Sequence, residues 1–352
     1  MKKLLFIILG ICLGLSLFAD IDFYGQARTG LWYDMQDEDL TGTEARTEMS
    51  LLLYKNSRLG MNFSSENYKA NAEIGFSESV VLRQLYGEYQ FKKFSLLAGK
   101  TYTGFSEFAS QVVSCLYSYD NMLIGYGQYY DGSQLQIRFT LNNGIYFSLQ
   151  QPKKIDPAGF GADAVDALIP KISMGYKTNF DKIYFHTTFG LNITNYNKEM
   201  TDGIDESIMA YIGALTLKYV DGPYYLRAQV NFGQNSFDYG ILGSTARFAD
   251  WDYAKNEIIN LSNFGGYAEF GYTINEKTAI KTGFGYSGSE MDTLDETDGA
   301  SSLFFQSIHK LAKDIWLIPE VGMINDMEDG MGNKEGARTY FGAKLQMNFS
   351  HK

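Results

Sequence analysis

The sequence offers little material for acid–base or metal chemistry. It has 3 His and 2 Cys residues. His186 lies in a strongly alternating segment, but no Ser and Asp residues are identifiable as its catalytic partners. Cys12 lies in an N-terminal apolar run whose removal would leave Cys115 as the single thiol, so no cysteine pair could bind a metal. We therefore expect no catalytic residue, no metal site and no cofactor, and we interpret a lone histidine here as a polar lining residue.

Basic side chains recur instead on the polar face of many patterned segments. If successive residues point in opposite directions, one face collects Lys, Arg and fewer Glu, while the other collects apolar residues. If the polar face lines a narrow passage, its fixed positive charges would raise the local concentration of anions there. The bases on the polar face are Arg28, Arg46, Arg58, Lys100, Arg138, Lys171, Lys177, Lys218, Arg227, Lys281, Arg338 and Lys344, and the acids are Glu48, Glu73, Glu88, Glu269 and Glu320.

The elements that must position these residues are β-strands. In 337–349, Phe341, Leu345 and Phe349 belong to one face and Tyr340 and Lys344 to the other, whereas a helix would scatter both sets. About sixteen segments have this period of two, within the even-numbered range of closed bacterial barrels. We predict strands at 21–35, 46–63, 69–77, 82–91, 94–103, 130–141, 145–151, 171–180, 183–194, 207–220, 223–237, 263–274, 278–289, 302–311, 315–325 and 337–349.

Two local features disagree with this pattern. Pro319 lies inside a predicted strand, where proline cannot donate a ladder hydrogen bond. The alternation is also irregular in 303–310. The predicted strands 302–311 and 315–325 are therefore the least regular of the series.

The connections between the predicted strands alternate between short and long. Short ones, such as 92–93, 142–144 and 181–182, suit tight hairpins, whereas most alternate connections are much longer, with 78–81 as a brief exception. This asymmetry is typical of an outer-membrane barrel. Backbone groups in hydrocarbon must be paired, so the sheet has to close with apolar side chains outward and polar ones around water. We therefore predict an all-β fold, a closed antiparallel transmembrane β-barrel, rather than a soluble β-sandwich.

Aromatic residues lie near many predicted strand ends. In a membrane-spanning barrel such residues form girdles at the two interfaces, whereas in a sandwich they would fill the core. The residues concerned are Tyr33, Phe63, Tyr89, Phe91, Tyr219, Tyr224, Tyr272 and Phe349.

The N-terminus has the layout of a secretory signal peptide. Lys2 and Lys3 precede the apolar run 4–18, and Ala19 occupies a small-residue cleavage position. Lipidation at Cys12 is the less favoured alternative, because bulky Ile11 precedes it. We expect a cleaved signal peptide at 1–19 and one domain at 20–352. The net charge of −11 excludes a nucleic-acid binder, which needs a positive surface.

The chain resembles the trimeric sixteen-stranded porins of Gram-negative outer membranes in its strand and loop order over about 20–349. Three features support the resemblance: the segment Leu82–Phe105, LRQLYGEYQFKKFSLLAGKTYTGF, a long third outer loop, and a terminal strand that ends at Phe349. The resemblance implies a third loop folded into the barrel to narrow it, and a homotrimer among outer-membrane lipids. It also implies passive diffusion of small hydrophilic solutes and ions. The chain departs from the family in its three residues after Phe349 and in the few acids of its third loop.

The third loop, 104–129, is rich in apolar residues, including Phe105, Phe108 and Val112, which need burial. Folding inward would supply it, although packing over a neighbouring subunit is the alternative. Inward folding would place Glu107 and Asp120 opposite bases, and the excess of bases predicts a weak preference for anions. The expected pore-lining and constriction residues are Arg28, Arg46, Arg58, Lys100, Glu107, Asp120, Arg138, Arg227, Lys281 and Lys344.

Two other functional classes remain open from the sequence. In one, the long acidic loops bind ligands at the cell surface, and the protein is an adhesin or ligand-binding barrel with incidental conductance. In the other, the protein is an outer-membrane hydrolase, which would need a catalytic constellation that the sequence does not offer. Diffusion through a water-filled barrel is therefore the leading hypothesis.

Overall fold

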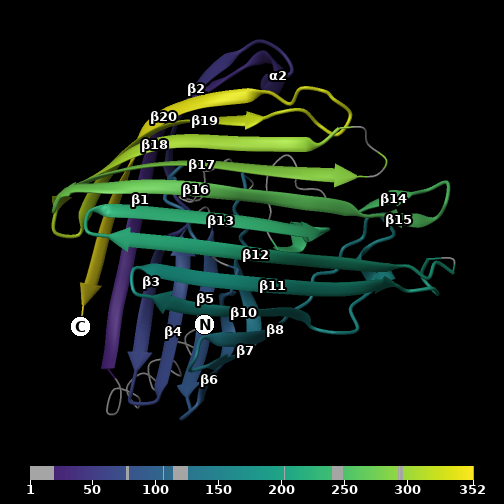
Figure 1. Cartoon of the computed structure of the whole chain (residues 1–352), viewed down its shortest axis with the longest axis horizontal. Coiled ribbons are helices and arrows are strands. Elements are labelled where there is room, and N and C mark those ends of the chain that lie inside the picture. Colours follow the sequence, from purple (N-terminus) through teal and green to yellow (C-terminus); the bar gives the residue numbers. More distant parts are fainter. Residues whose placement is uncertain are drawn as a thin grey trace.

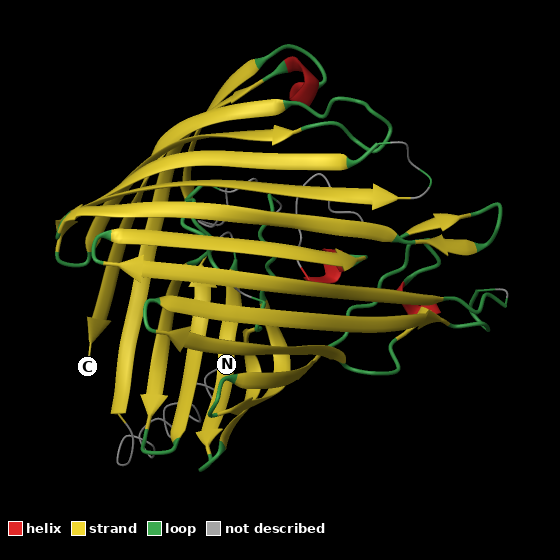
Figure 2. Cartoon of the chain, viewed as in Figure 1, coloured by secondary structure: helices red, strands yellow, loops and turns green. Residues whose placement is uncertain are grey.

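A closed antiparallel barrel forms the body of the protein (Figures 1 and 2). The computed structural model describes residues 20–76, 79–105, 107–113, 126–201, 203–239, 249–291, 293 and 296–351. The wall strands are β1 (Asp20–Gln36), β2 (Arg46–Leu53), β3 (Ser57–Ser64), β4 (Tyr68–Phe76), β5 (Val80–Gln90), β6 (Phe94–Tyr102), β7 (Ser133–Leu141), β8 (Ile145–Gln150), β10 (Lys171–Phe180), β11 (Ile183–Tyr196), β12 (Ser207–Asp221), β13 (Tyr224–Gln234), β16 (Leu261–Asn275), β17 (Thr278–Met291), β18 (Asp298–Ala312), β19 (Ile315–Asp326) and β20 (Ala337–His351).

The wall closes between its first and last strands. β1 pairs with β20 along one edge and with β2 and β3 along the other. Because β2 and β3 are successive parts of one wall strand, the barrel has sixteen strands, which confirms the predicted fold class. In the part of the chain that the structure describes, no helix is long and apolar enough to cross a membrane.

The remaining elements belong to the long loops. Figure 1 shows long loops at one end of β11–β18 and short turns at the other. A hairpin of two short strands projects from the loop between β13 and β16. These outer elements are α2 (Glu38–Thr41), η1 (Ala162–Ala164), β9 (Val165–Asp166), η2 (Ser236–Tyr239), β14 (Asp250–Asp252) and β15 (Glu257–Ile259).

Alternation along each strand separates an apolar outer face from a polar inner face. On β20, Phe341 and Met347 are 46% and 43% exposed, whereas Tyr340 and Lys344, at positions of the opposite parity, are 1% and 5% exposed. Across the described barrel, large exposed side chains are mostly apolar, and many buried ones are polar or charged. This distribution is the reverse of that in a soluble protein and suits a wall between lipid and an aqueous interior.

Aromatic side chains gather on the outer face near strand ends. At the short-turn end, the rings of Tyr89 and Phe91 lie 4.7 Å apart, and Phe91 stacks on Phe94 at 4.6 Å. Further round the wall, Tyr224 and Tyr272 lie 5.3 Å apart. These groups match the predicted interfacial girdles.

The tight turn between β7 and β8 depends on Gly144. Its φ is +94°, a region that favours glycine. An added Cβ would also lie 1.9 Å from the carbonyl oxygen of Lys177 on neighbouring β10. Both conformation and space therefore require glycine here.

Pro319 is accommodated by a local gap in one ladder. It pairs with Ala343 of β20, but the ladder between β18 and β19 passes from Gln306↔Glu320 to His309↔Leu317 without intervening pairs. The gap lies on the β18 side, where proline has no N–H to donate. The register does not shift across this gap, so the inner and outer faces are preserved.

The predicted strand 46–63 is interrupted at 54–56. Tyr54 turns its fully buried ring into the barrel and accepts a hydrogen bond from Trp32 Nε1 at 2.8 Å. Beyond this interruption, in the part that the structure describes, β2 pairs only with β1. The wall beside β2 is formed by short strands: β4–β8, called here the low wall, have 6 to 11 residues each. The strands of the tall wall are longer, and β11, β12, β16, β17, β18 and β20 have 14 or 15 residues each.

Candidate functional site

The described parts of the third loop, 103–113 without residue 106 and 126–132, lie against the inner wall. Two backbone amides of this loop donate to one buried carboxylate of β19: Val112 N lies 2.9 Å and Val113 N 3.1 Å from the oxygens of Glu320. The same carboxylate accepts from Gln306 Nε2 at 2.7 Å and from the Tyr340 hydroxyl at 3.0 Å. Glu320 is therefore a fully hydrogen-bonded anchor for the loop.

A second wall carboxylate holds Ser110, two residues before Val112. Glu269 of β16 accepts from both the backbone N–H and the hydroxyl of Ser110, each at 2.6 Å. Lys281 of β17 donates to the same hydroxyl at 2.6 Å and lies 3.7 Å from the Glu269 carboxylate. The loop is thus attached to β16 and β17 at this second point, besides its attachment to β19.

Glu107 makes the third attachment, at β10 and β11. Its Oε1 accepts from the Tyr184 hydroxyl at 2.9 Å and lies 3.0 Å from His186 Nδ1. Lys177 Nζ is 4.0 Å from the same oxygen. Burial alone would raise the pKa of this carboxyl, but the His186 contact and the Lys177 charge outweigh it and lower the pKa to about 2. Glu107 is therefore an anion across the whole working pH range.

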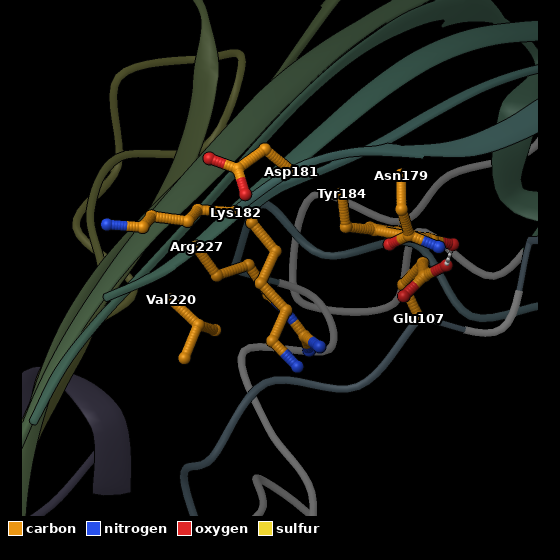
Figure 3. A pocket seen from close by; sticks show the side chains of 8 residues that line it. Glu107, Asn179, Asp181, Lys182, Tyr184, Val220 and Arg227 are labelled. Carbon is orange, nitrogen blue, oxygen red and sulfur yellow. Dashed lines mark hydrogen bonds between the residues drawn. The ribbon is translucent and has the colours of Figure 1, made fainter. Parts of the chain in front are cut away.

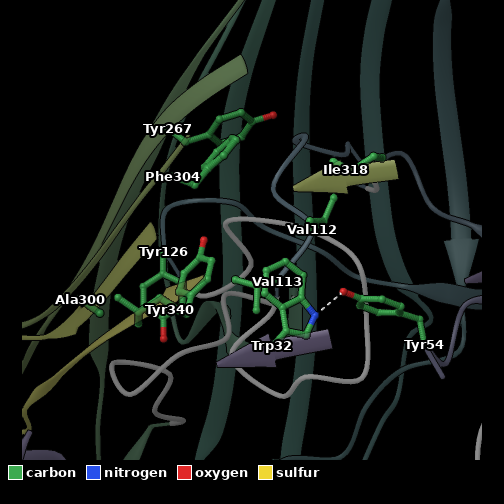
Figure 4. Close-up of a cluster of buried hydrophobic side chains, with 11 residues drawn as sticks. Trp32, Tyr54, Val112, Val113, Tyr126, Tyr267, Ala300, Phe304, Ile318 and Tyr340 are labelled. Carbon is green, nitrogen blue, oxygen red and sulfur yellow. Dashed lines mark hydrogen bonds between the residues drawn. The ribbon is translucent and has the colours of Figure 1, made fainter. Parts of the chain in front are cut away.

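An apolar cluster forms where the loop meets β1, β18, β19 and β20 (Figure 4). Val112 and Val113 are almost completely buried in it, and the returning residue Tyr126 joins them. These described apolar residues of the loop are therefore buried against wall residues, whereas Phe108 is 39% exposed. The wall and loop side chains of this cluster are Trp32, Tyr54, Val112, Val113, Tyr126, Tyr267, Ala300, Phe304, Ile318, Ile324 and Tyr340.

A buried ion cluster fixes the end of the loop. Lys171 of β10 is 1% exposed, and its Nζ lies 2.8 Å from Asp131 Oδ1 and 3.5 Å from Asp238 Oδ1. Lys153, from the next outer loop, approaches Asp238 at 3.4 Å. Burial raises the pKa of the Asp131 carboxyl even with Lys171 beside it. Three loops and the wall are therefore joined through these charges.

Replacing Lys171 by Met is expected to destabilise the barrel. The substitution leaves Asp131 and Asp238 buried with only Lys153 to compensate, and breaking a buried ion pair costs about 3–5 kcal/mol. Guanidinium unfolding in detergent, followed by tryptophan fluorescence, measures the change. Lys198→Met, at an exposed lysine that pairs with exposed Asp205, is the matched control and should change the free energy of unfolding by less than about 1 kcal/mol. Equal effects of the two variants would contradict the assigned role of Lys171.

Most of the predicted pore-lining bases lie on inward positions. Arg58 lies 3.4 Å from Glu73, and Arg138 donates to the Tyr102 carbonyl. Arg227 donates to the carbonyl of loop residue Phe108. The other inward bases, placed by strand parity or by contacts described above, are Arg28, Lys281 and Lys344.

Three predicted residues have different outcomes. Arg46 is inward by parity but lies at the outer end of β2, where it is largely exposed and pairs with Glu48 at 3.3 Å. Lys100 pairs in register with Leu85 and Leu135, whose exposed side chains mark the outer face. The structure therefore places Lys100 outside the barrel rather than in the lumen. Asp120 lies outside the described residues.

One inward base was missed by strict alternation. The ladder between β4 and β5 passes from Glu73↔Gln84 to Ile74↔Leu82, which leaves Arg83 as the extra residue of a β-bulge. Its side chain reaches inside, where Nε lies 2.8 Å from Glu73 Oε1. The succession of two polar residues, Arg83 and Gln84, within an apolar run is the sequence signal of this insertion.

A polar pocket of about 390 Å³ lies beside the loop, over β10–β13 (Figure 3). Glu107, Asn179 and Tyr184 lie together in one part of it, and Arg227 lies apart from them. Lys218, the cross-strand partner of Arg227, also lines the pocket. Among the residues that the structure describes, no group of three or more His, Cys, Asp or Glu side chains could hold a metal ion. Carboxylate, amide and basic groups in one pocket are suited to reversible contact with polar solutes and ions.

Solved structures with the same architecture are outer-membrane proteins. The chain is similar to the outer membrane channel DcaP of Acinetobacter baumannii, with a TM-score of 0.73 and 16% identity over 95% of this chain and 98% of that one. It is similar to the anion-selective porin from Comamonas acidovorans at 0.63 and 12%, over 94% and 100% of the two chains. OmpT of Vibrio cholerae, in its trimer form, gives 0.61 and 14%, over 94% and 100%. No protein-family model and no curated protein matches the chain.

The closed sheet, with its apolar outer face and polar interior, defines a membrane-spanning β-barrel. Its fold is that of the outer-membrane porins, as the resemblance of the sequence predicts.

Proposed function

We propose that this protein is a channel of the bacterial outer membrane through which small hydrophilic solutes and ions diffuse. The observation that carries the proposal is the reversed distribution of side chains, apolar on the outside and polar or charged on the inside. Such a wall is stable only between lipid and water. The similarity to channels and porins supports the same function.

The first test is swelling of liposomes that contain the purified protein. Neutral sugars of increasing size should enter at rates that fall with molecular size, because a water-filled pore discriminates mainly by diameter. Protein-free liposomes are the control. Loop-dependent capture of a ligand by a barrel that admits no sugar would instead support the surface-adhesin alternative.

The channel prefers anions weakly. Lumen carboxylates are largely engaged: Glu269 and Glu320 hold the loop, and Glu73 lies between Arg58 and Arg83. Inward bases such as Lys218 and Arg227 have no such carboxylate contacts among the described residues, so positive charge dominates the field inside the passage. The anion-selective porin with the same fold supports this preference.

The third loop forms the constriction of the channel. Its anchors at Glu107, Ser110 and Val112 run along the tall wall from β10 to β19. The passage then lies between the loop and the low wall, where Arg28, Arg58 and Arg138 are among the inward bases. The remaining expected lining residues are Arg227, Lys281 and Lys344.

The protein assembles as a homotrimer through its low wall. The outer faces of β2 and β5 expose Met49, Leu51 and Val80, at 63%, 77% and 65%. In the described chain, one edge of β2 also lacks a neighbouring strand. Open sheet edges do not face lipid within a membrane, so a second copy is the fitting cover. The trimer form of OmpT, which has the same fold, supports this assembly.

Replacing Met49 and Leu51 together by Ser is expected to weaken the trimer. The change removes apolar surface from the proposed contact, at about 25 cal/mol per Å² buried. The temperature at which the trimer becomes monomers in detergent, followed by light scattering, should fall by about 10 °C or more. The matched control is Val230→Ser with Phe232→Ser, at similarly exposed positions on the tall wall. An equal fall in both variants would place the contact elsewhere.

Residues 1–19 act as the export signal, and the mature domain begins at Asp20. The basic start, apolar run and small residue at 19 support this assignment. The intact mass of the protein purified from outer membranes tests it, because retention of the leader would add the mass of 19 residues.

A further inference from the structure

The polar pocket between the loop and β10–β13 contains an arrangement of charge that the wall alone does not explain. Lys218 of β12 and Arg227 of β13 are direct cross-strand partners on the inner face. Like charges directly opposite each other destabilise an antiparallel pair. If the inner face only had to be hydrated, a neutral or acidic residue at one of these two positions would make the strand pair more stable.

Three cationic groups surround one tyrosine ring at this place. Lys218 Nζ lies 5.4 Å, Arg227 Cζ 5.9 Å and Lys281 Nζ 4.7 Å from the ring centroid of Tyr225. They come from β12, β13 and β17 and therefore converge from different parts of the wall. Cations gathered around one ring repel one another unless an anion lies among them.

The carboxylates nearby are already engaged. Glu269 holds Ser110 and Lys281, and Lys182, which also lines the pocket, is paired with Asp221 at 2.7 Å. Among the described residues, neither Lys218 nor Arg227 has a carboxylate within 4.0 Å. Asp181 also lines the pocket, but among the described residues it makes no ion pair with either of these two bases. The site therefore retains positive charge.

The other side of the pocket presents groups that bind hydroxyls. The contacts of Glu107 with Tyr184, His186 and Lys177 all use its Oε1. Its other carboxylate oxygen is thus an acceptor with no such contact, and Asn179 adds an amide beside it (Figure 3). Carboxylate and amide groups are suited to the hydroxyls of a sugar. The pocket volume, about 390 Å³, accommodates a solute of monosaccharide size.

We propose that this pocket is a binding subsite for a hydroxylated organic anion, a sugar acid or sugar phosphate. Its acidic group lies between Lys218 and Arg227, and its hydroxyl groups face Glu107 and Asn179. The inference rests on the proposed channel function and deepens it, because it names the class of solute that the channel retains on its way through. A neutral sugar lacks the acidic group, and a simple carboxylate lacks the hydroxyls, so each can contact only one side of the pocket.

The test uses single channels of the full protein in planar bilayers at about 0.1 M KCl, where screening is modest. Sodium glucuronate and glucose 6-phosphate carry both features of the proposed solute, glucose lacks the charge, and acetate lacks the hydroxyls. Glucuronate and glucose 6-phosphate should interrupt the current reversibly at concentrations about tenfold lower than glucose or acetate. Equal blocking concentrations for all four solutes would overturn the proposal.

Lys218 is the residue to change, because it makes no described contact with the loop. Lys218→Gln should raise the blocking concentration of glucuronate about fivefold, and Lys218→Glu about tenfold or more. Lys198→Gln, an exposed outer-loop lysine, is the matched control and should leave block unchanged. Asn179→Ala should weaken block by glucuronate and leave the response to acetate unchanged. An unaltered block in the Lys218 variants would contradict the assignment.

The channel function and the solute subsite can be tested separately. A protein that conducts KCl but is not blocked preferentially by glucuronate or glucose 6-phosphate remains a channel without this subsite. A protein that conducts no ions at all contradicts both the subsite and the proposed function.

Discussion

Deletion of residues 105–120 is expected to raise the single-channel conductance about twofold or more. The described part of this segment is attached to inner-wall residues from β11 to β19, and in the proposed channel it occupies part of the lumen. Conductance grows with the open cross-section of a water-filled pore. Removing it also removes the Glu107 carboxylate from the passage, so the anion preference should become stronger. Single-channel recordings in planar bilayers at several salt concentrations measure both changes.

A deletion in an outer loop is the control for the effect of shortening the chain. Removing residues 249–260, which contain the β14–β15 hairpin, takes away a structure that projects from the rim and should leave conductance within about a fifth of its original value. If deletion of 105–120 left conductance equally unchanged, the loop would not form the constriction. The wall residues would then have to set the pore size.

Replacing Glu320 by Leu is expected to have the second large effect, on both stability and gating noise. The carboxylate accepts four hydrogen bonds, from Val112 N, Val113 N, Gln306 and Tyr340. Removing the acceptor leaves these buried donors unsatisfied, at a cost of about 3 kcal/mol after the apolar gain of Leu is counted. The freed loop should also produce current fluctuations that the original channel lacks.

Two variants make the Glu320 prediction specific. Glu320→Gln keeps the shape and one acceptor oxygen, so its unfolding free energy and its noise should lie between those of the original protein and Glu320→Leu. Glu48→Leu removes a carboxylate that is about half exposed and should change stability by less than about 0.5 kcal/mol. Quiet recordings and unchanged stability for Glu320→Leu would show that other contacts hold the loop.

The strands and their faces could be predicted because period-two alternation is a local property. On β20, the separation of Phe341 and Met347 from Tyr340 and Lys344 is visible in the sequence and is reproduced in the burial of these side chains. A barrel in lipid strengthens this signal, since each face meets only one solvent. The alternation of short turns and long loops then determines the closure of the sheet.

The errors arose where a strand departs from regular alternation. Arg83 is the inserted residue of a bulge, and a single insertion reverses the parity of everything beyond it. Lys100 is a different case: its strand alternates without a register shift there, and the ladder to Leu85 and Leu135 places it on the outer face with Leu96 and Ala98. The break at 54–56 divides one predicted strand because Tyr54 turns inward to Trp32. None of these features has a strong local signal.

The loop could be predicted to need burial, but not how it is held. Its apolar residues need a surface to pack against, and Val112 and Val113 pack in a cluster with residues of the wall. Glu269 and Glu320 were recognised only as water-facing acids, whereas the structure makes them anchors for backbone amides. His186 was recognised only as a polar lining residue, and it contacts Glu107. Contacts between residues so far apart in the chain depend on the closed wall, which no local pattern specifies.

The most direct measurement is the current through purified protein in a planar lipid bilayer with an approximately tenfold KCl gradient. The side-chain distribution predicts discrete, ohmic conductance steps. The inner-face bases Lys218 and Arg227, which have no carboxylate within 4.0 Å among the described residues, predict a small reversal potential of the sign that marks anion preference. A bilayer that stays electrically sealed with correctly folded protein inserted would contradict the central claim that this barrel encloses a continuous column of water.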